Sequence, residues 1–321
     1  MTATALDRRD LEFQLREVLA DSTLVRTRQT GDALEEIYAA AARMASQPLA
    51  RGFSLVMRQY GDYVDALALA RERYQSVPSA NPEQEEAFEP LIARADVRCD
   101  LLAQKAACEG GLALCLYGAD LLTEENEHPD AALRAEAGNL FGLLAPVIAG
   151  WPAMAFPDDS EASQRARTAA GELLGRKVWH GQSQGLQILM QRMQIDLQAA
   201  GSGPGQQWAL SLSETLQQAV RVTQSLGQSL MEGQTSRVLA NSQNYLRLFG
   251  HVLVAWMWLR QANVAARALP VAVSEADEQF YRGKVQAAQH FFHRELPRVA
   301  QDLVLLRNQD DTCLNMQPEW F

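Results

Sequence analysis

The sequence predicts an all-α protein, and two observations carry this prediction. Ala, Leu, Gln, Glu and Arg, which favour helices, prevail in a chain of 321 residues. Strand signals are nearly absent, because β-branched and polar residues do not alternate over any sustained stretch and no Asn-Gly or Asp-Gly hairpin pair occurs. With 47% hydrophobic residues, the chain has enough apolar material for one large domain or two medium ones.

Apolar residues at helical spacing predict helices along the first half of the chain. The stretch Ser76–Pro82 is rich in Ser, Pro and Asn and predicts a loop. An acidic turn through Glu124–Pro129 separates the last two helices of this half. The predicted helices cover residues 11–19, 34–44, 49–74, 83–122 and 131–149.

The second half begins with helix-breaking residues. Trp151-Pro152 and Phe156-Pro157 predict the end of one helix, and Asp158–Ser160 predicts the start of the next. The run Gly201–Gly205 has the composition of a linker. Beyond it, helices are predicted over 208–230, 236–266 and 276–306. The predicted organisation is therefore N-terminal helices over 1–48, a helical bundle over 49–200 and a C-terminal helical extension over 206–321.

Charge and cysteine usage exclude several classes of function. A net charge of −10 argues against a nucleic-acid partner and against an anionic membrane surface. The four cysteines show no C-x-x-C spacing, which indicates a reduced compartment. No apolar signal segment follows Met1, and the apolar run His251–Leu259 is too short to span a bilayer. The sequence therefore predicts a cytoplasmic protein without a membrane span.

Six stretches, taken in order, resemble the acyl-CoA dehydrogenase superfamily, specifically its longer bacterial branch with a helical C-terminal extension. Their order and spacing make the resemblance specific, although each helical pattern is loose alone. In that branch a β-domain packs against the flavin ring, whereas no strand-forming block is visible in this sequence. The resemblance therefore implies a truncated form that lacks the β-domain. The stretches are Arg8–Leu19 (RRDLEFQLREVL), Ala66–Gln75 (ALALARERYQ), Ala95–Tyr117, Leu140–Trp151, Tyr245–Ala262 and Phe280–Pro297.

The family's catalytic stretch reads Ile-Tyr-Glu-Gly-Thr-Asn-Gly-Ile-Gln, and its glutamate removes the substrate α-proton while hydride leaves the β-carbon for the flavin. The matching stretch here is Val178–Gln187 (VWHGQSQGLQ), which is one residue longer and has His180 at the glutamate position. An imidazole can act as a base near neutral pH, but the resemblance leaves it no flavin to work with. No Asp or Glu occurs between Glu36 and Asp62, where some relatives place their base. The sequence therefore predicts no catalytic residue.

Other residues have a functional and a structural interpretation. The resemblance implies vestigial cofactor-binding positions at Arg73, Gly181 and Gln187, although Arg73 in the Arg-Glu-Arg run is more simply a solvated charge. His290 and His293 have a spacing compatible with metal, but no third ligand is near in sequence, so no metal site is predicted.

Further residues on the predicted helices bear on packing and association. Gly110-Gly111 inside a helix predicts close helix packing, with close ligand approach as the alternative. Gln184, Gln187, Gln191 and Gln194 recur at helical spacing and predict a polar face. Phe249, Trp256 and Trp258 form an aromatic cluster that is either core or a sticky oligomer face.

The resemblance implies a degenerate acyl-CoA dehydrogenase-like protein that is non-catalytic and belongs to fatty acid metabolism. We expect it to act as a homodimer or in association with a full-length acyl-CoA dehydrogenase, without a cofactor of its own. One alternative is a subunit that completes an FAD-dependent active site in a heteromer, with FAD supplied by the partner. A second alternative is a binder of acyl-CoA or another lipid thioester.

Overall fold

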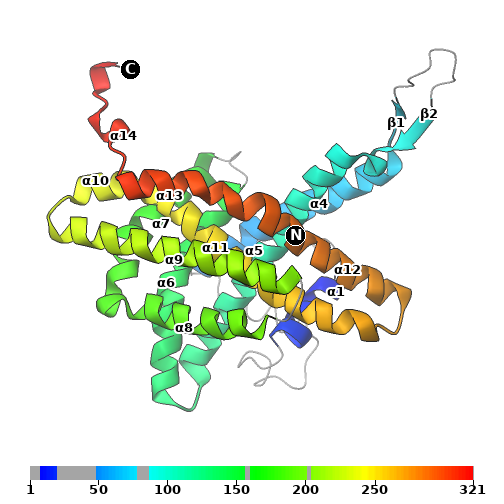
Figure 1. The fold of residues 1–321 in the computed structure, drawn as a ribbon, viewed down its shortest axis with the longest axis horizontal. Helices are drawn as coiled ribbons and strands as arrows, with labels where there is room; N and C mark the ends of the chain where they lie inside the picture. Colours follow the sequence, from blue (N-terminus) through cyan, green and yellow to red (C-terminus); the bar gives the residue numbers. More distant parts are fainter. Residues whose placement is uncertain (1–7, 20–47, 78–86, 156–159, 201–203, 321) are drawn as a thin grey trace.

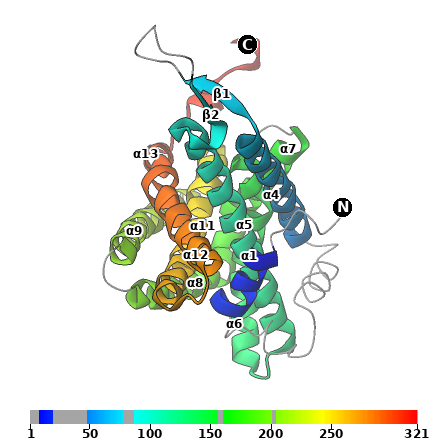
Figure 2. The ribbon, with the colours of Figure 1, turned by 90° about the vertical axis from the view of Figure 1, so that its right-hand side faces the viewer.

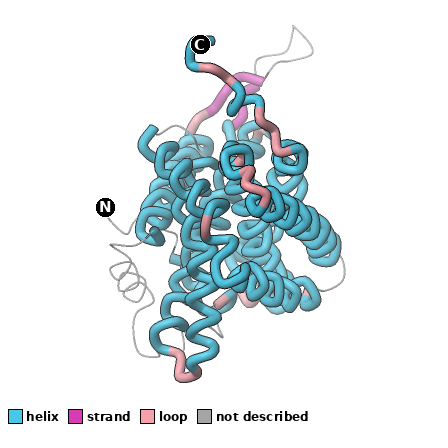
Figure 3. The backbone as a smooth tube through the Cα atoms, turned by 90° about the vertical axis from the view of Figure 1, so that its left-hand side faces the viewer, coloured by secondary structure: helices cyan, strands magenta, loops and turns pink. Residues whose placement is uncertain are grey.

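A computed structural model describes residues 8–19, 48–77, 87–155, 160–200 and 204–320 (Figure 1). Almost all of these residues are helical, so the predicted all-α class is confirmed (Figure 3). The N-terminal element consists of α1 (Arg8–Phe13) and the π-helical turn η2 (Gln14–Val18). The helix predicted over residues 34–44 and the predicted helix start at Asp158 lie outside the described residues.

The bundle begins with three long helices that pack on one another. The middle helix is buried along its central turns, from Cys108 to Leu121, because neighbouring helices surround it. Two further helices continue the bundle and are joined by the 3-10 segment η4 (Lys177–Ser183). The helices are α4 (Pro48–Glu72), α5 (Ala95–Glu127), α6 (Ala131–Ala155), α7 (Ser160–Gly175) and α8 (Gln184–Ala199).

A β-hairpin projects from the bundle where the sequence predicted a loop and a helix start (Figure 1). Strands β1 (Tyr74–Val77) and β2 (Ala87–Pro90) pair antiparallel, and the 3-10 turn η3 (Leu91–Ala93) leads into α5. The prediction of a loop is therefore wrong at Ser76 and Val77, and the prediction of a helix is wrong over residues 87–94, whereas residues 78–86 lie outside the described residues. Pro90 has ψ 143° and Arg94 has ψ 136°, so extended residues flank η3 and α5 begins only after Arg94. We refer to residues 74–77 and 87–90 as the hairpin arm.

Helix α6 continues through Pro146 and Pro152 to Ala155, so the break predicted at Trp151-Pro152 is wrong. Packing stabilises the helix here although proline supplies no amide donor. Trp151 is buried and faces Gly250 on α11 (Ser242–Ala268), where an added Cβ would lie 2.0 Å from the Trp151 ring. The segment Ala131–Met154 is the one described segment long and apolar enough to cross a membrane by length and composition. It is 72% buried inside the fold, which is also typical of a core helix.

The C-terminal extension is more divided than its periodicity predicted. The helix predicted over 236–266 is broken at Asn241, and the helix predicted over 276–306 relaxes into π and 3-10 turns around Pro297. Proline supplies no amide donor for the α-helical ladder, which explains the second break. The elements are α9 (Pro204–Met231), α10 (Thr235–Ala240), α11 (Ser242–Ala268), η5 (Leu269–Val271), α12 (Glu275–His290), η6 (Phe291–Glu295), η7 (Leu296–Arg298), α13 (Val299–Asn308), α14 (Thr312–Asn315) and η8 (Pro318–Trp320).

Helix α11 is the centre of the fold. It contacts α5, α6, α7, α9, α12 and α13, so one core joins helices on both sides of the linker predicted at residues 201–205, of which Pro204 and Gly205 belong to α9. Phe249, Trp256 and Trp258 are each at most 2% exposed. The aromatic cluster is therefore core, and its interpretation as a sticky oligomer face is wrong. The domain boundary predicted at this linker stays a prediction.

The paired glycines of α5 lie where α11 and α4 approach most closely. A Cβ added at Gly110 would lie 2.6 Å from Val254 Cγ1 and 2.7 Å from Trp258 Nε1, and one at Gly111 would lie 3.0 Å from Val56 Cγ2. The close packing predicted for these glycines is confirmed.

Replacing Gly110 with Ala is expected to lower the free energy of unfolding by about 1–3 kcal/mol, because the added methyl overpacks the contact with α11. Urea unfolding followed by circular dichroism measures this loss. The matched control is Gly171→Ala on α7, where nothing lies within 4 Å of the added Cβ and alanine is expected to stabilise the helix slightly. Equal effects of the two substitutions would contradict the packing account.

Candidate functional site

His180 lies in η4, between α7 and α8, and its side chain is exposed. The two residues before it anchor the segment. Val178 is fully buried, and the Trp179 indole Nε1 donates a hydrogen bond to the carbonyl oxygen of Leu174. The anchors hold the backbone against the fold and leave the imidazole at the surface.

The three residues that follow His180 adopt the left-handed backbone conformation. The φ angle is 54° at Gly181, 58° at Gln182 and 63° at Ser183. This conformation costs roughly 1–2 kcal/mol for each residue other than glycine. The Gln187 side chain supports the turn by donating from Nε2 to the Gln182 carbonyl oxygen at 3.3 Å.

Helix α8 starts at Gln184 and lies close against α6. The Asn139 amide Nδ2 donates to Gln184 Oε1 at 3.2 Å, and an added Cβ at Gly185 would lie 2.7 Å from the Asn139 carbonyl oxygen. The glycine therefore permits the close approach of the two helices directly after the strained turn.

A cavity of about 250 Å³ lies where the turn meets α6. Its polar lining includes three basic side chains, and no carboxylate belongs to the described residues that line it. Glu172 on α7 lies beside the cavity and forms ion pairs with two of the basic side chains, at 2.7 Å to Arg176 and 3.7 Å to Lys177. The lining residues are Gly138, Asn139, Gly142, Leu143, Arg176, Lys177, His180 and Gly185.

The structure brings together some of the residues predicted from the sequence. Gly181, Gln187 and His180 share the turn, which places the matched segment in one location. Arg73 is exposed between α4 and β1 at the base of the hairpin arm and does not line the cavity.

The predicted glutamine face and histidine pair also have clear positions. Gln184, Gln187, Gln191 and Gln194 are all exposed on α8, as expected of a polar face. His290 is buried and lies 3.6 Å from Glu295, whereas His293 is exposed. Within the part of the chain that the structure describes, no group of three His, Cys, Asp or Glu residues could hold a metal ion.

The fold also contains a buried charge network that the sequence did not predict. The Lys284 ammonium on α12 is 1% exposed, and it pairs with Asp10 on α1 and, at 2.8 Å, with Glu109 on α5. Lys105 pairs with the same Glu109. The network therefore holds the N-terminal helix against the bundle and the extension (Figure 2). Lys284 is 274 residues from Asp10 and 175 residues from Glu109 in the sequence, so periodicity alone gives no signal of these contacts.

The two carboxylates of this network have opposite pKa shifts. Burial raises the pKa of Asp10, although Lys284 opposes the rise. Burial would also raise the pKa of Glu109, but Lys105 and Lys284 together outweigh it and lower that pKa. The Glu109 carboxylate is thus the charged centre of the network, with one ammonium group on either side.

Comparison with known proteins agrees with the resemblance found in the sequence. Residues 189–317 match the family described as Acetyl-CoA dehydrogenase C-terminal like. The broad-specificity linear acyl-CoA dehydrogenase FadE5 of Mycobacterium tuberculosis is 25% identical over 299 residues, which cover 81% of this chain and 48% of the relative. The 3-methylmercaptopropionyl-CoA dehydrogenase of Ruegeria pomeroyi is 25% identical over 288 residues, which cover 78% of this chain and 47% of that relative.

The chain is similar to members of the acyl-CoA dehydrogenase superfamily. It spans about half the length of the relatives it matches. The matched family region includes most of α8 and the elements from α9 to α14, so it corresponds to the C-terminal helices of an acyl-CoA dehydrogenase. The turn with His180 precedes this region and is assigned to the catalytic segment by the sequence resemblance.

Proposed function

We propose that this chain is a non-catalytic relative of the acyl-CoA dehydrogenases that acts by pairing with a second copy of itself. The observation that carries the first half of the proposal is the exposed imidazole of His180, in a cavity whose described lining contains no carboxylate. A general base must reach the proton that it removes and is most effective in a site shielded from water. An exposed imidazole on a strained turn provides neither condition.

The hairpin arm supports the second half of the proposal. Ser76 pairs with Phe88 and Tyr74 pairs with Pro90, so both aromatic side chains lie on one face of the arm. Tyr74 is 63% exposed and Phe88 is 64% exposed, which leaves this face without cover from the described residues. A two-stranded hairpin is marginally stable alone, and its free strand edges can pair with another strand.

A second copy of the chain is the occupant that fits these features. Two identical arms related by a two-fold axis present the same edge and the same aromatic face to each other, which is the requirement for a closed dimer. The base of the arm is firm, because Leu91 and Ile92 of η3 pack on the cluster that contains Tyr63 and Leu101. The base of the arm is therefore packed on the bundle, and its aromatic face is left free to pair.

Multi-angle light scattering on the purified chain tests this pairing. The wild-type protein is expected to have the mass of two copies at micromolar concentration, and the double variant Tyr74→Ser/Phe88→Ser the mass of one. Leu210→Ser on α9 is the matched control, because Leu210 is 58% exposed and lies outside the arm. A wild-type monomer, or a double variant that remains dimeric, would refute the proposed interface.

A second candidate function is binding of acyl-CoA or another thioester of coenzyme A without chemistry. Arg176, Lys177 and His180 line the cavity beside the turn, and clustered basic side chains favour the phosphate groups of such a ligand. Calorimetric titration with coenzyme A tests this candidate. Binding that is weakened by Lys177→Met and unchanged by Arg165→Met, an exposed ion-paired position on α7, would support it.

The heteromeric alternative predicts a different outcome. If the chain completes an FAD-dependent site, mixing it with a full-length acyl-CoA dehydrogenase should produce a stable complex and change the turnover of that enzyme. We expect the chain to sediment separately from the dehydrogenase and to leave its turnover unchanged.

A further inference from the structure

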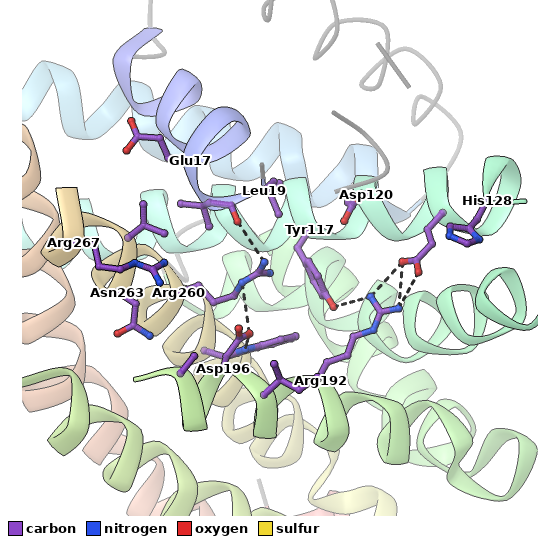
Figure 4. A pocket seen from close by; sticks show the side chains of 16 residues that line it. Glu17, Leu19, Tyr117, Asp120, His128, Arg192, Asp196, Arg260, Asn263 and Arg267 are labelled. Carbon is purple, nitrogen blue, oxygen red and sulfur yellow. Dashed lines mark hydrogen bonds and ion pairs between the residues drawn. The ribbon is translucent and has the colours of Figure 1, made fainter. Parts of the chain in front are cut away.

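A cavity of about 510 Å³ lies between α5, α8 and α11, on the side of the bundle where η2 and Leu19 form one wall (Figure 4). Its volume is within the range of small-molecule sites. It is distinct from the cavity beside His180, because none of the described lining residues is shared.

One end of the cavity holds an ordered polar group. Arg192 on α8 donates to both carboxylate oxygens of Glu124 at 3.2–3.3 Å and to the Tyr117 hydroxyl at 3.3 Å (Figure 4). Burial raises the pKa of Tyr117, so this phenol keeps its proton at neutral pH. Its oxygen accepts from Arg192, and its hydroxyl proton remains a donor beside the cavity.

Arg260 on α11 is the central cation of the cavity. Its guanidinium lies over the ring of Tyr117 at 5.3 Å and over the ring of Trp256 at 5.9 Å, which holds the planar group in place. Its polar contacts are long, at 3.4 Å from Nη2 to the Val18 carbonyl oxygen and 3.6 Å from Nε to Asp196 Oδ2. Ordinary N–H to O hydrogen bonds are about 2.7–3.2 Å long, so the donors of Arg260 are held but poorly satisfied.

Two further side chains on α11 add hydrogen-bond donors beside Arg260. Arg260, Asn263 and Arg267 recur at spacings of three and four, which places them along one face of α11, and all three line the cavity. Arg267 is exposed, and no carboxylate among the described residues forms an ion pair with it. This row therefore presents guanidinium and amide donors to whatever occupies the cavity.

The carboxylates of the cavity are already engaged. Glu124 is held by Arg192, and Glu17 accepts from the Tyr281 hydroxyl at 3.0 Å. Asp196 accepts from the Trp256 indole Nε1 at 2.6 Å and neighbours Arg260. Asp120 also has an interaction partner in the fold. The groups that can still form hydrogen bonds with a ligand are thus donors, which favours an anion over a cation as the ligand.

The rest of the lining is apolar. Val18, Leu19 and Val264 lie near the Arg260 end, and Ile195 is 67% exposed on α8. An apolar rim beside a fixed guanidinium suits a molecule with one charged end and a short apolar body.

We infer that this cavity binds a small organic carboxylate, with its oxygens taken by Arg260 and Arg267 and its apolar body against Ile195 and Val264. The planar fork of a guanidinium matches the two oxygens of a carboxylate. The Tyr117 hydroxyl and the Asn263 amide supply neutral donors at its sides. The site is independent of the dimer interface proposed above.

Ligand-observed nuclear magnetic resonance and calorimetry with butyrate as the probe test the inference. Butyrate is expected to bind at one site per chain, with an affinity about tenfold weaker in Arg260→Met, the loss expected for one charge-assisted contact. Arg267→Met is expected to weaken binding by a smaller factor without loss of stability, since Arg267 is exposed. Arg282→Met is the control, because Arg282 is an exposed residue on α12 that pairs with Glu278 and does not line the cavity.

Two further probes separate the carboxylate from other ligands. Butylammonium has the same apolar body with the opposite charge and is expected not to bind, and inorganic phosphate is expected not to displace butyrate. No saturable butyrate binding, equal binding to Arg260→Met and wild type, or preferential binding of butylammonium or phosphate would each overturn the inference. If Arg260→Met fails to fold, unchanged butyrate binding in Arg267→Met overturns it instead.

Discussion

Replacing Lys284 with Met is expected to lower the free energy of unfolding by about 3–5 kcal/mol, the typical cost of removing one partner from a buried ion pair. The side chain is 1% exposed and pairs with Asp10 and Glu109, each about 2% exposed. Without the ammonium, Glu109 keeps its ion pair with Lys105, whereas the buried Asp10 carboxylate loses its ion-pair partner. The methionine side chain is similar in length to that of lysine, so the loss of unfolding free energy comes from the missing charge rather than from a cavity.

Urea unfolding of four proteins resolves this network: wild type, Lys284→Met, Asp10→Asn and the double variant. The double variant is expected to be more stable than Lys284→Met alone, because the uncharged amide is not an unpaired buried charge. Lys177→Met is the control, since its ion pair with Glu172 is partly exposed and is expected to contribute less than about 1 kcal/mol. A loss below that value for Lys284→Met would show that the network does not hold the N-terminal helix.

Replacing Trp258 with Ala is expected to cost about 3–5 kcal/mol, the range for deleting a large buried aromatic side chain. Trp258 is fully buried, and its indole Nε1 donates to the Ala106 carbonyl oxygen at 2.8 Å. The substitution therefore leaves a cavity between α11 and α5 and removes the hydrogen bond to the Ala106 carbonyl oxygen. Thermal unfolding followed by circular dichroism measures the loss.

The exposed Trp320 provides the matched control. It is 67% exposed, so Trp320→Ala is expected to change the free energy of unfolding by less than about 0.5 kcal/mol. If Trp258→Ala left stability unchanged and dissociated a dimer, the aromatic cluster would be an interface after all.

The all-α class and most helix positions follow from local patterns. The prediction of a helix over 49–74 agrees closely with α4, which ends at Glu72, because its apolar spacing is regular and Pro48 is its first residue. The hairpin arm was missed because each strand has four residues, too few for a sustained alternation, and the pairing joins segments that are not adjacent in the sequence. Pro152 was misinterpreted because the buried contact of Trp151 with α11 decides the helix, and that contact spans about a hundred residues of sequence.

The candidate site was predicted in part. His180, Gly181 and Gln187 could be found from the sequence because a catalytic segment is continuous along the chain. The cavity between α5, α8 and α11 could not be found from the sequence, because Tyr117, Arg192 and Arg260 come from three helices that are distant in the sequence. A weak signal was present in the spacing of Arg260, Asn263 and Arg267, which places donors on one face of α11.

The proposal that the chain is non-catalytic is tested most directly by acyl-CoA-dependent reduction of an electron acceptor. Purified protein is incubated with FAD, an acceptor dye and straight-chain acyl-CoA substrates of several lengths. Our account predicts no reduction above a protein-free control and no FAD retained after gel filtration. Stoichiometric FAD together with turnover that His180→Gln abolishes would contradict it.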